Sequence, residues 1–208
     1  MHLPKVDKNG MPYLSYSQIS SFIKNKKEYI KSYFFNEPIA FTAYLDFGNK
    51  VGTALQHNDF SDFSEEEQLT LKKVKRLDEF EKNIRVDFGD FYVTGFIDTN
   101  NKTLNHIIDY KTGSANKIDE YTKDTYIQPH IYALGIEQEK GKLPKKAEVI
   151  LIERYGNAFK GEPLTVGKEI IHIPIDISKE RLEYAKQLVI DTAKEIEYYY
   201  KLFLELNS

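Results

Sequence analysis

The chain lacks cysteine altogether, so it cannot form a disulfide framework or a cysteine-ligated iron–sulfur cluster. It also lacks a long apolar run, since no stretch of its 208 residues is apolar for long enough to span a bilayer. Residues 1–11 carry charges and a proline instead of the apolar core of a signal peptide. No segment rich in Pro, Gly or Ser divides the chain. These absences predict a cytoplasmic protein without a membrane segment, folded as a single domain over residues 1–208.

An excess of positive charge is absent as well, because 29 basic residues stand against 32 acidic residues, for a formal net charge of −3. A chain of this balance has no broad positive field that would attract nucleic acid. Contacts with DNA would have to come from local clusters, although such clusters are often no more than solvated helix faces. The two candidate clusters are Lys24, Lys26, Lys27 and Lys31, and Lys72, Lys73, Lys75 and Arg76.

Hydrophobic periodicity and turn residues predict an alternation of helices and strands. A first helix is expected from Ser15 or Ser17 to about residue 35, with a break near Asn25. Further helices are expected over 44–60, 65–78 and 127–140. Strands are expected over 80–88, 91–98, 104–111, 147–154 and 169–175. This order predicts an α/β fold with a central mixed β-sheet flanked by helices.

A long C-terminal helix is expected to begin at Ser178, with apolar residues at alternating spacings of three and four. Such a stripe is typical of a coiled-coil seam, which would form a homodimer or bind a protein partner. Ala185 and Thr192 are weak seam residues, and they favour a helix that packs on the sheet of its own chain. The stripe consists of Leu182, Ala185, Val189, Thr192, Ile196, Tyr199, Phe203 and Leu206.

Two acidic residues and a lysine follow apolar runs in neighbouring predicted strands. Asp98 ends the run that contains Gly95, and Asp109 and Lys111 follow Ile107 and Ile108. Side chains in a strand alternate between faces, so Asp109 and Lys111 point the same way. A turn over residues 99–102 would bring Asp98 beside Asp109. Two carboxylates can share a hard cation such as Mg²⁺ or Mn²⁺, with the lysine close to whatever that cation binds.

Four signals in one order carry a resemblance to a known family: residues 14–19, residues 47–57, the Asp98, Asp109 and Lys111 set, and the stretch from Tyr126 to Leu134. Together they resemble the PD-(D/E)XK nuclease superfamily, most closely its RecB-type exonuclease branch. The resemblance implies a restriction-endonuclease-like core. It also implies hydrolysis of phosphodiester bonds in DNA with Mg²⁺ or Mn²⁺ and without an iron–sulfur cluster.

The resemblance also implies a role for each site residue. The metal ligands would be His57, Asp98, Asp109 and the backbone carbonyl of Tyr110. Lys111 would orient the attacking water or stabilise developing negative charge. Gln128 and Tyr132, four apart on one helical face, would reach the site or the substrate, and Glu81 would support it. Each of the last three, like His57, is also compatible with an ordinary packed or exposed side chain.

Three functions remain open at this stage. The first is a metal-dependent DNA nuclease, with an exonuclease of recombination, repair or phage DNA metabolism favoured by the resemblance. The second is a catalytically idle module of the same fold that binds DNA or recruits a partner, although the complete set of acids and lysine argues against it. The third is a structure- or site-specific endonuclease, which shares the chemistry and differs in substrate geometry.

Overall fold

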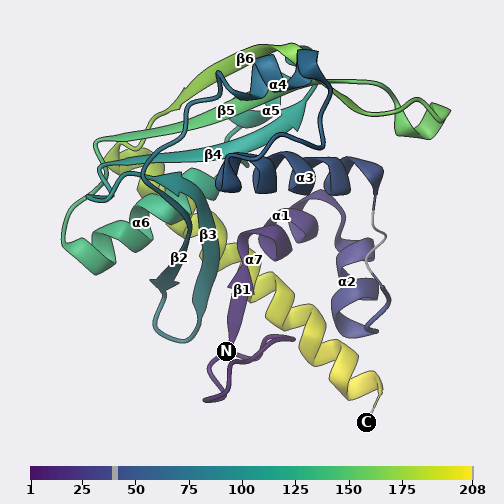
Figure 1. Cartoon of the computed structure of the whole chain (residues 1–208). Coiled ribbons are helices and arrows are strands. Elements are labelled where there is room, and N and C mark those ends of the chain that lie inside the picture. Colours follow the sequence, from purple (N-terminus) through teal and green to yellow (C-terminus); the bar gives the residue numbers. More distant parts are fainter. Residues whose placement is uncertain (39–41, 208) are drawn as a thin grey trace.

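The computed structural model describes residues 1–38 and 42–207, and its centre is a six-stranded mixed sheet (Figure 1). The strands are β1 (Tyr13–Ser15), β2 (Glu79–Asp87), β3 (Tyr92–Asn100), β4 (His106–Gly113), β5 (Lys146–Tyr155) and β6 (Thr165–Ile175). The helices are α1 (Tyr16–Lys24), α2 (Lys26–Phe34), α3 (Ala43–His57), α4 (Glu65–Leu71), α5 (Ile118–Thr122), α6 (Gln128–Lys140) and α7 (Lys179–Leu206). Two short 3-10 helices, η1 (Ala115–Lys117) and η2 (Ala158–Lys160), lie in connections.

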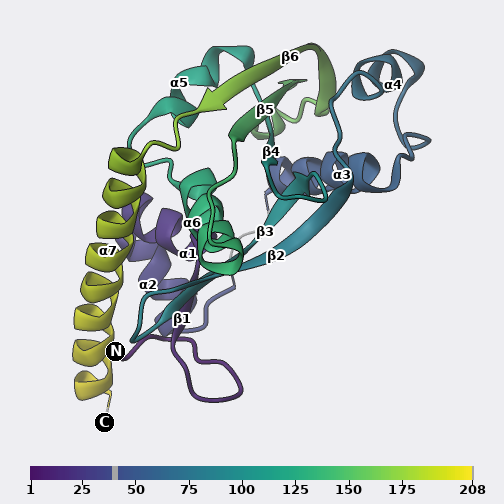
Figure 2. The ribbon, with the colours of Figure 1, turned by 90° about the vertical axis from the view of Figure 1, so that its left-hand side faces the viewer.

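The sheet separates two layers of helices (Figures 1 and 2). Helices α1, α6 and α7 bury their apolar residues on one face, whereas α3 and α4 cover the other. Strand β5 shows why the core has two sides, since Ile150 and Ile152 face α3 while Val149 and Leu151 face the opposite way. A strand that is buried on both faces reads as a continuous apolar run, as this one does. Each such side chain contributes roughly 1.5–3 kcal/mol on burial.

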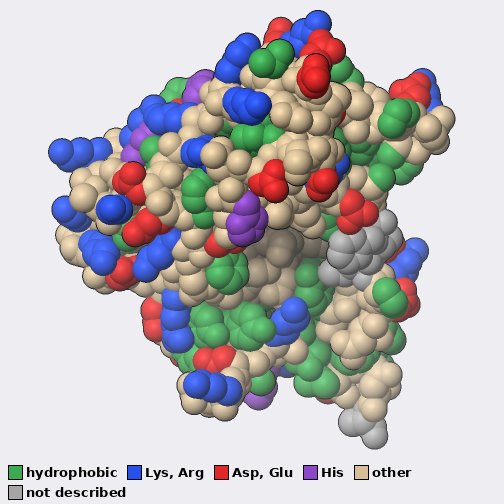
Figure 3. All heavy atoms as spheres, in the orientation of Figure 1, with side chains coloured by type: hydrophobic (Ala, Val, Ile, Leu, Met, Phe, Trp, Pro, Cys, Tyr) green, Lys and Arg blue, Asp and Glu red, His purple; other side chains and the backbone are tan. Residues whose placement is uncertain are grey.

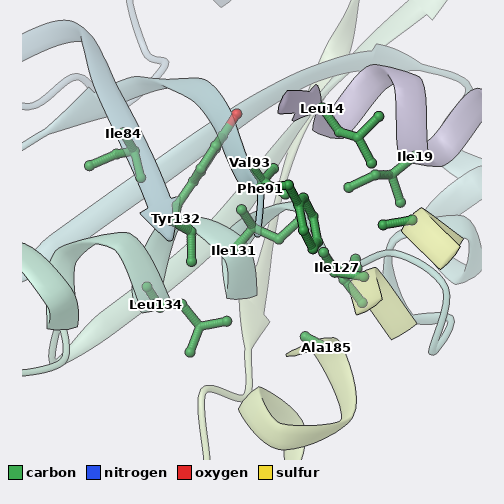
Figure 4. Close-up of a cluster of buried hydrophobic side chains, with 14 of the residues drawn as sticks. Leu14, Ile19, Ile84, Phe91, Val93, Ile127, Ile131, Tyr132, Leu134 and Ala185 are labelled. Carbon is green, nitrogen blue, oxygen red and sulfur yellow. The ribbon is translucent and has the colours of Figure 1, made fainter. Parts of the chain in front are cut away.

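Helix α6 is the main link between the sheet and the helices on its face. Ile131, Tyr132 and Leu134 are buried among side chains from β2, β3 and α7 (Figure 4). The ring of Tyr132 lies in this cluster, and its hydroxyl lies at the edge of the cluster (Figure 4). The helix begins at Gln128 because Pro129 is tolerated only in the first turn, where its missing N–H would have no partner.

Strand β3 has one nearly continuous edge and one interrupted edge. Its more continuous edge pairs with the antiparallel β2 at every position from residue 79 to residue 87 except Glu81. Its other edge pairs with the parallel β1 at residues 92–94 and with the antiparallel β4 only at Thr99 and Asn100. Residues 95–98 therefore face a gap between β1 and β4, where β4 leaves β3 to pair with the parallel strand β5.

Most elements lie where the sequence predicts them. The break at Asn25 is real, because Asn25 ends α1 and accepts a hydrogen bond from the Glu28 amide at the start of α2. Three boundary predictions are wrong. Strand β3 does not end at Asp98 but runs on to Asn100, so Asp98 lies inside the strand. Helix α4 ends at Leu71 and not near residue 78, and β6 begins at Thr165 and not near residue 169. The three-residue strand β1 and the short helices α5, η1 and η2 were not expected from the sequence.

The long C-terminal helix packs on its own chain. Leu182, Ala185, Val189 and Ile196 are buried in the cluster shared with α1 and α6. The inner part of the apolar stripe therefore packs on its own chain, which is the arrangement that the weak seam residues Ala185 and Thr192 predict. A homodimer or protein partner at the exposed end of α7 stays a prediction. Among the helices that the structure describes, none combines the length and the apolarity needed to cross a membrane.

Candidate active site

The gap along β3 determines how Asp98 is placed. The β3–β4 register sets Asp98 opposite Asp109, one step beyond the last paired residues. Because the strands diverge there, the Tyr110 amide has no carbonyl partner on β3, and it donates instead to Asp98 Oδ2 at 2.6 Å. The N–H and C=O of one strand residue point to the same edge, so the Tyr110 carbonyl also faces the gap.

Asp109 is held by one of its oxygens and left free at the other. Its Oδ2 lies 2.7 Å from Lys111 Nζ and accepts a hydrogen bond from the Tyr126 hydroxyl at 2.7 Å. Its Oδ1 is buried and has no hydrogen-bond partner among the described residues. A buried carboxylate oxygen without a donor is costly. Tyr126 begins the motif that resembles the family's helix, but the sequence gives no sign of this contact, because no local pattern links Tyr126 to β4.

Glu81 completes a row of three carboxylates across β2, β3 and β4. The β2–β3 pairs on either side, Phe80 with Thr99 and Lys82 with Ile97, set Glu81 opposite Asp98, although these two residues are not themselves paired. The backbone of Glu81 is left-handed, with φ of 53°, a conformation that costs a residue with a side chain roughly 1 kcal/mol or more. Burial raises the pKa of Glu81. The row therefore concentrates negative charge where β4 leaves β3.

The pKa of Asp98 is raised from 3.8 to about 7 by burial first and by the charge of Asp109 second. Lys111 and the Tyr110 amide oppose this shift without cancelling it. Burial alone would lower the pKa of Lys111, but the charges of Asp109 and Asp98 outweigh burial and raise it. The site thus holds a lysine that stays protonated, but this one positive charge does not balance the negative charge of the carboxylates around it.

A cleft of about 570 Å³ opens beside this row. It is lined by Glu81, Asp98 and Lys111 on the sheet side and by one face of α3 on the other. The face of the molecule in Figure 3 is hollowed near its centre, below α3 in that view. The α3 residues that line the cleft include Tyr44, Leu45, Gly48, Asn49, Gly52 and Gln56.

His57 is not brought to this cleft, contrary to the expected ligand set. It lies one residue beyond Gln56, which turns its side chain by about 100° around α3. It is exposed and lines a second, smaller cleft of about 300 Å³ with Asp59 and Asp62. Gln56 lines the cleft that contains Asp98 instead. The sequence pattern located the helix that lines the cleft, and the role of His57 as a metal ligand stays a prediction.

Gln128 and Tyr132 of α6 lie near Asp98 and Asp109 but outside the cleft. Gln128 Nε2 donates to the Tyr132 hydroxyl at 2.7 Å, as their four-residue spacing permits. A Cβ added at Gly95 would lie 3.0 Å from the Tyr132 ring, so glycine there lets the ring approach β3. Burial, followed by the charge of Asp109, raises the pKa of Tyr132. Neither Gln128 nor Tyr132 is among the residues that line the cleft.

The lysines expected to contact DNA are not part of the cleft wall. Lys24, Lys27 and Lys73 are exposed, and Lys26 is ion-paired with Glu195 of α7. Lys72 donates a long hydrogen bond, 3.4 Å, to Gln68 on α4. The lining residues of the large cleft include Lys111 but none of these five.

A model of the PD-(D/E)XK nuclease superfamily matches residues 54–201, a stretch that contains the acids, Lys111 and the α6 pair. The chain belongs to this superfamily. The match confirms the superfamily that the sequence motifs indicated. No curated protein matches the chain.

Solved structures resemble the chain over nearly its whole length. One is a putative exonuclease from Eubacterium rectale, with a TM-score of 0.59 and 11% identity, covering 95% of this chain and 87% of that one. Another is the alkaline exonuclease LHK-Exo from Laribacter hongkongensis, with a TM-score of 0.40 and 11% identity over 94% of this chain and 95% of that one. The first likeness shows a shared fold.

PD-(D/E)XK nucleases generally use divalent metal ions, and part of this site fits such an ion. The free Oδ1 of Asp109, the Asp98 carboxylate and the Tyr110 carbonyl are hard oxygen donors, which Mg²⁺ and Mn²⁺ prefer. Within residues 1–38 and 42–207, no group of three or more His, Asp or Glu side chains is arranged to hold a metal. Two carboxylates suffice for Mg²⁺, which keeps several waters and binds substrate phosphates.

Proposed function

We propose that this protein is a metal-dependent DNA nuclease, with an exonuclease favoured. The observation that carries the proposal is the uncompensated carboxylate pair: Asp109 has a buried oxygen without a donor, and Asp98 has a pKa raised to about 7. A purely structural pair would be neutralised by its neighbours. Here the neighbouring lysine takes only one oxygen of Asp109 and leaves the other available.

Asp98, Asp109 and the carbonyl of Tyr110 would hold the ion. When bound, a divalent ion supplies positive charge that polarises a phosphate and lowers the pKa of water. Tyr126 and Lys111 fix the Asp109 carboxylate from one side, which keeps Oδ1 directed away from them. The Tyr110 amide fixes Asp98 in the same way.

Lys111 supplies a second positive charge at the cleft wall. Its side chain is 27% exposed, so Nζ can contact both Asp109 and a phosphate in the cleft. Because its pKa is raised, it stays protonated at neutral pH and cannot itself serve as a base. Its role is to stabilise negative charge that develops on the phosphate and to orient the water that attacks it.

The choice of an exonuclease rests on the RecB-type resemblance and on the fold shared with the putative exonuclease from Eubacterium rectale. Roles in recombination, repair or phage DNA metabolism follow from the resemblance alone. A test is to incubate the purified protein with linear and covalently closed circular DNA in Mn²⁺, Mg²⁺ or EDTA. We expect nucleotides to be released from linear DNA in the metal ions and the circle to survive. Cleavage of the circle would favour an endonuclease, and no cleavage of either would favour an idle module.

Gln56 and His57 allow a matched pair of variants for the α3 side of the cleft. We propose that the amide of Gln56, and not the imidazole of His57, faces the ion or its waters. Gln56→Ala should therefore lower the rate and weaken Mn²⁺ binding, whereas His57→Ala should change neither by more than about twofold. A large loss with His57→Ala and none with Gln56→Ala would restore the histidine as the helix ligand.

A further inference from the structure

The connection between β5 and β6, residues 156–164, carries a large apolar side chain that does not pack in a hydrophobic core. This connection, hereafter the arm, projects from the sheet as the green segment at the right of Figure 1. Phe159 in η2 is 86% exposed, the largest fraction among the large apolar side chains of the described residues. Among the described residues, the ring of Tyr44 on α3 is its one aromatic neighbour, with centroids 5.4 Å apart. An exposed phenylalanine at a loop tip is a candidate contact for a partner molecule.

The arm is held in a defined position. The Tyr44 hydroxyl donates to Asn157 Oδ1 at 3.2 Å and accepts a hydrogen bond from the Ala158 amide at 3.1 Å. Asn157 Oδ1 also accepts from the Phe159 amide. Gly156, with φ of +87°, turns the chain so closely that a Cβ there would lie 2.0 Å from the Pro163 carbonyl oxygen. A loop fixed in this way presents Phe159 with little ordering entropy left to lose on binding.

The base of the arm is continuous with the large cleft. Tyr44 lines that cleft at the N-terminal end of α3, and Gln56 lines it twelve residues on, roughly 18 Å away along the helix. The guanidinium of Arg154 lies over the Tyr44 ring, 4.3 Å from its centroid. Arg154 stands at an irregularity in the β5–β6 register, and such bulges redirect side chains. Its Nε is buried and has no hydrogen-bond partner among the residues described.

These features together fit one kind of occupant. An exposed aromatic face binds nucleobases by stacking, whatever the sequence, and a guanidinium binds phosphate with its N–H groups. We propose that Phe159 and Arg154, positioned by Tyr44, form a binding site for single-stranded DNA at the α3 N-terminal end of the cleft, where a base stacks on Phe159 and a phosphate meets Arg154. The choice of DNA rests on the proposed nuclease function. The site lies beyond the carboxylate row and takes part in no chemical step.

The test measures binding without cleavage. A single-stranded oligodeoxynucleotide that carries 2-aminopurine is titrated with the full chain in EDTA and in Ca²⁺, and both anisotropy and the fluorescence of the base are recorded. Stacking of one base corresponds to about a 5- to 150-fold difference in affinity. Phe159→Ala should cause a loss in this range and abolish the fluorescence quenching, whereas Phe159→Trp should retain both. Leu69→Ala, which truncates a 63% exposed side chain on α4, is the matched control and should change neither.

Arg154 gives an independent readout. Arg154→Gln should reduce the slope of log affinity against log salt by about 0.7, the value for one phosphate contact on a single strand. Phe159→Ala should leave that slope unchanged. Phe159→Ala should melt at the wild-type temperature within a few degrees, because Phe159 is exposed. Arg154→Gln loses the contact with the Tyr44 ring, so a thermal melt checks that this variant is still folded at the temperature of the titration.

Equal affinity and quenching for wild type and Phe159→Ala would overturn the proposal, as would a wild-type protein that binds no oligonucleotide. Phe159 would then fit a protein surface better. The outcomes differ from those for the proposed function: binding that depends on Phe159 in a protein that cleaves nothing would support the strand site and refute the nuclease. Cleavage by a protein indifferent to Phe159 would do the reverse.

Discussion

Two buried carboxylate sites on adjacent parallel strands have opposite electrostatics. On β4 and β3, Asp109 and Asp98 share Lys111, and the pKa of Asp98 is raised to about 7. On β5, Glu148 is 3% exposed, and its pKa is lowered to about 2. The two strands are paired, with Asp109 next to Val149, the neighbour of Glu148. Burial is common to both sites, so the number of donors makes the difference.

Glu148 is surrounded by donors. Burial alone would raise its pKa, but hydrogen bonds from two lysines and two histidines outweigh that effect. The contacts to its oxygens are Lys75 Nζ at 3.2 Å, His106 Nε2 at 2.7 Å, Lys146 Nζ at 3.2 Å and His172 Nδ1 at 3.3 Å. A carboxylate with this many partners is a structural element, because it has nothing left to offer a ligand. The comparison teaches that a buried acid indicates chemistry only where its partners are too few.

Asp109→Asn should have the largest effect in this comparison. It removes a ligand charge while keeping the shape of the side chain, so cleavage should fall on the order of 10³-fold or more. The fold should persist, since the charge repulsion with Asp98 is relieved. Steady-state cleavage and a thermal melt measure the two effects. Asp119→Asn on exposed α5 is the control. Wild-type cleavage by Asp109→Asn would refute the site.

Lys111→Met should lower the rate on the order of 10²–10³-fold while Mn²⁺ still binds. The substitution removes the charge that stabilises the transition state but leaves both carboxylates. Calorimetric titration with Mn²⁺ measures the binding, and Lys117→Met, which removes a surface ion pair with Glu120, serves as control. Loss of Mn²⁺ binding together with the lysine would show that Lys111 is needed to build the site and not for the reaction.

Glu148→Gln should destabilise the fold and leave the chemistry alone. The pKa of Glu148 is lower in the folded state than its ordinary 4.5, so its contribution is present above about pH 5 and is lost as the pH falls toward 2. The lowered pKa corresponds to up to about 3 kcal/mol at pH 7. Urea unfolding at pH 7 and pH 3 measures the difference, which should shrink at pH 3. An unchanged stability at pH 7 would mean that the four donors stabilise Glu148 no better than water does.

Asp98→Asn should have the opposite sign. The pKa of Asp98 is raised in the folded state, so ionisation destabilises the protein as the pH rises through about 7. Removing the charge should therefore stabilise the metal-free protein by up to about 4 kcal/mol at pH 8, and by little at pH 4. Urea unfolding in EDTA at both values provides the measurement. A loss of stability at pH 8 would contradict the uncompensated character of the pair.

The sequence predicts the parts of the site that depend on local geometry. Strand alternation and one hairpin are enough to relate Asp98, Asp109 and Lys111, and all three lie together in the structure. The position of His57 outside the large cleft has a different origin, because the rotation of a helix is set by its packing on the sheet and not by its own sequence. The catalytic roles of Asp98, Asp109 and Lys111 stay predictions.

Contacts between distant segments could not be read from the sequence. Strand β1 has only three residues and no periodicity of its own. His106 and His172 show no spacing that joins them, and they meet only because β4 and β6 flank β5. The hydrogen bond from Tyr126 to Asp109 crosses from a loop to a strand. Each of these depends on the order of strands in the sheet, which patterns in single segments do not encode.

The left-handed backbone of Glu81 has a consequence for laboratory evolution. Glycine or asparagine would adopt that conformation at less cost, so a substitution at Glu81 would gain stability while losing a carboxylate. A screen that rewards heat resistance alone would thus select against the row of acids itself. Thermostable variants of this protein are better sought in surface loops and helix caps, with cleavage scored in every round.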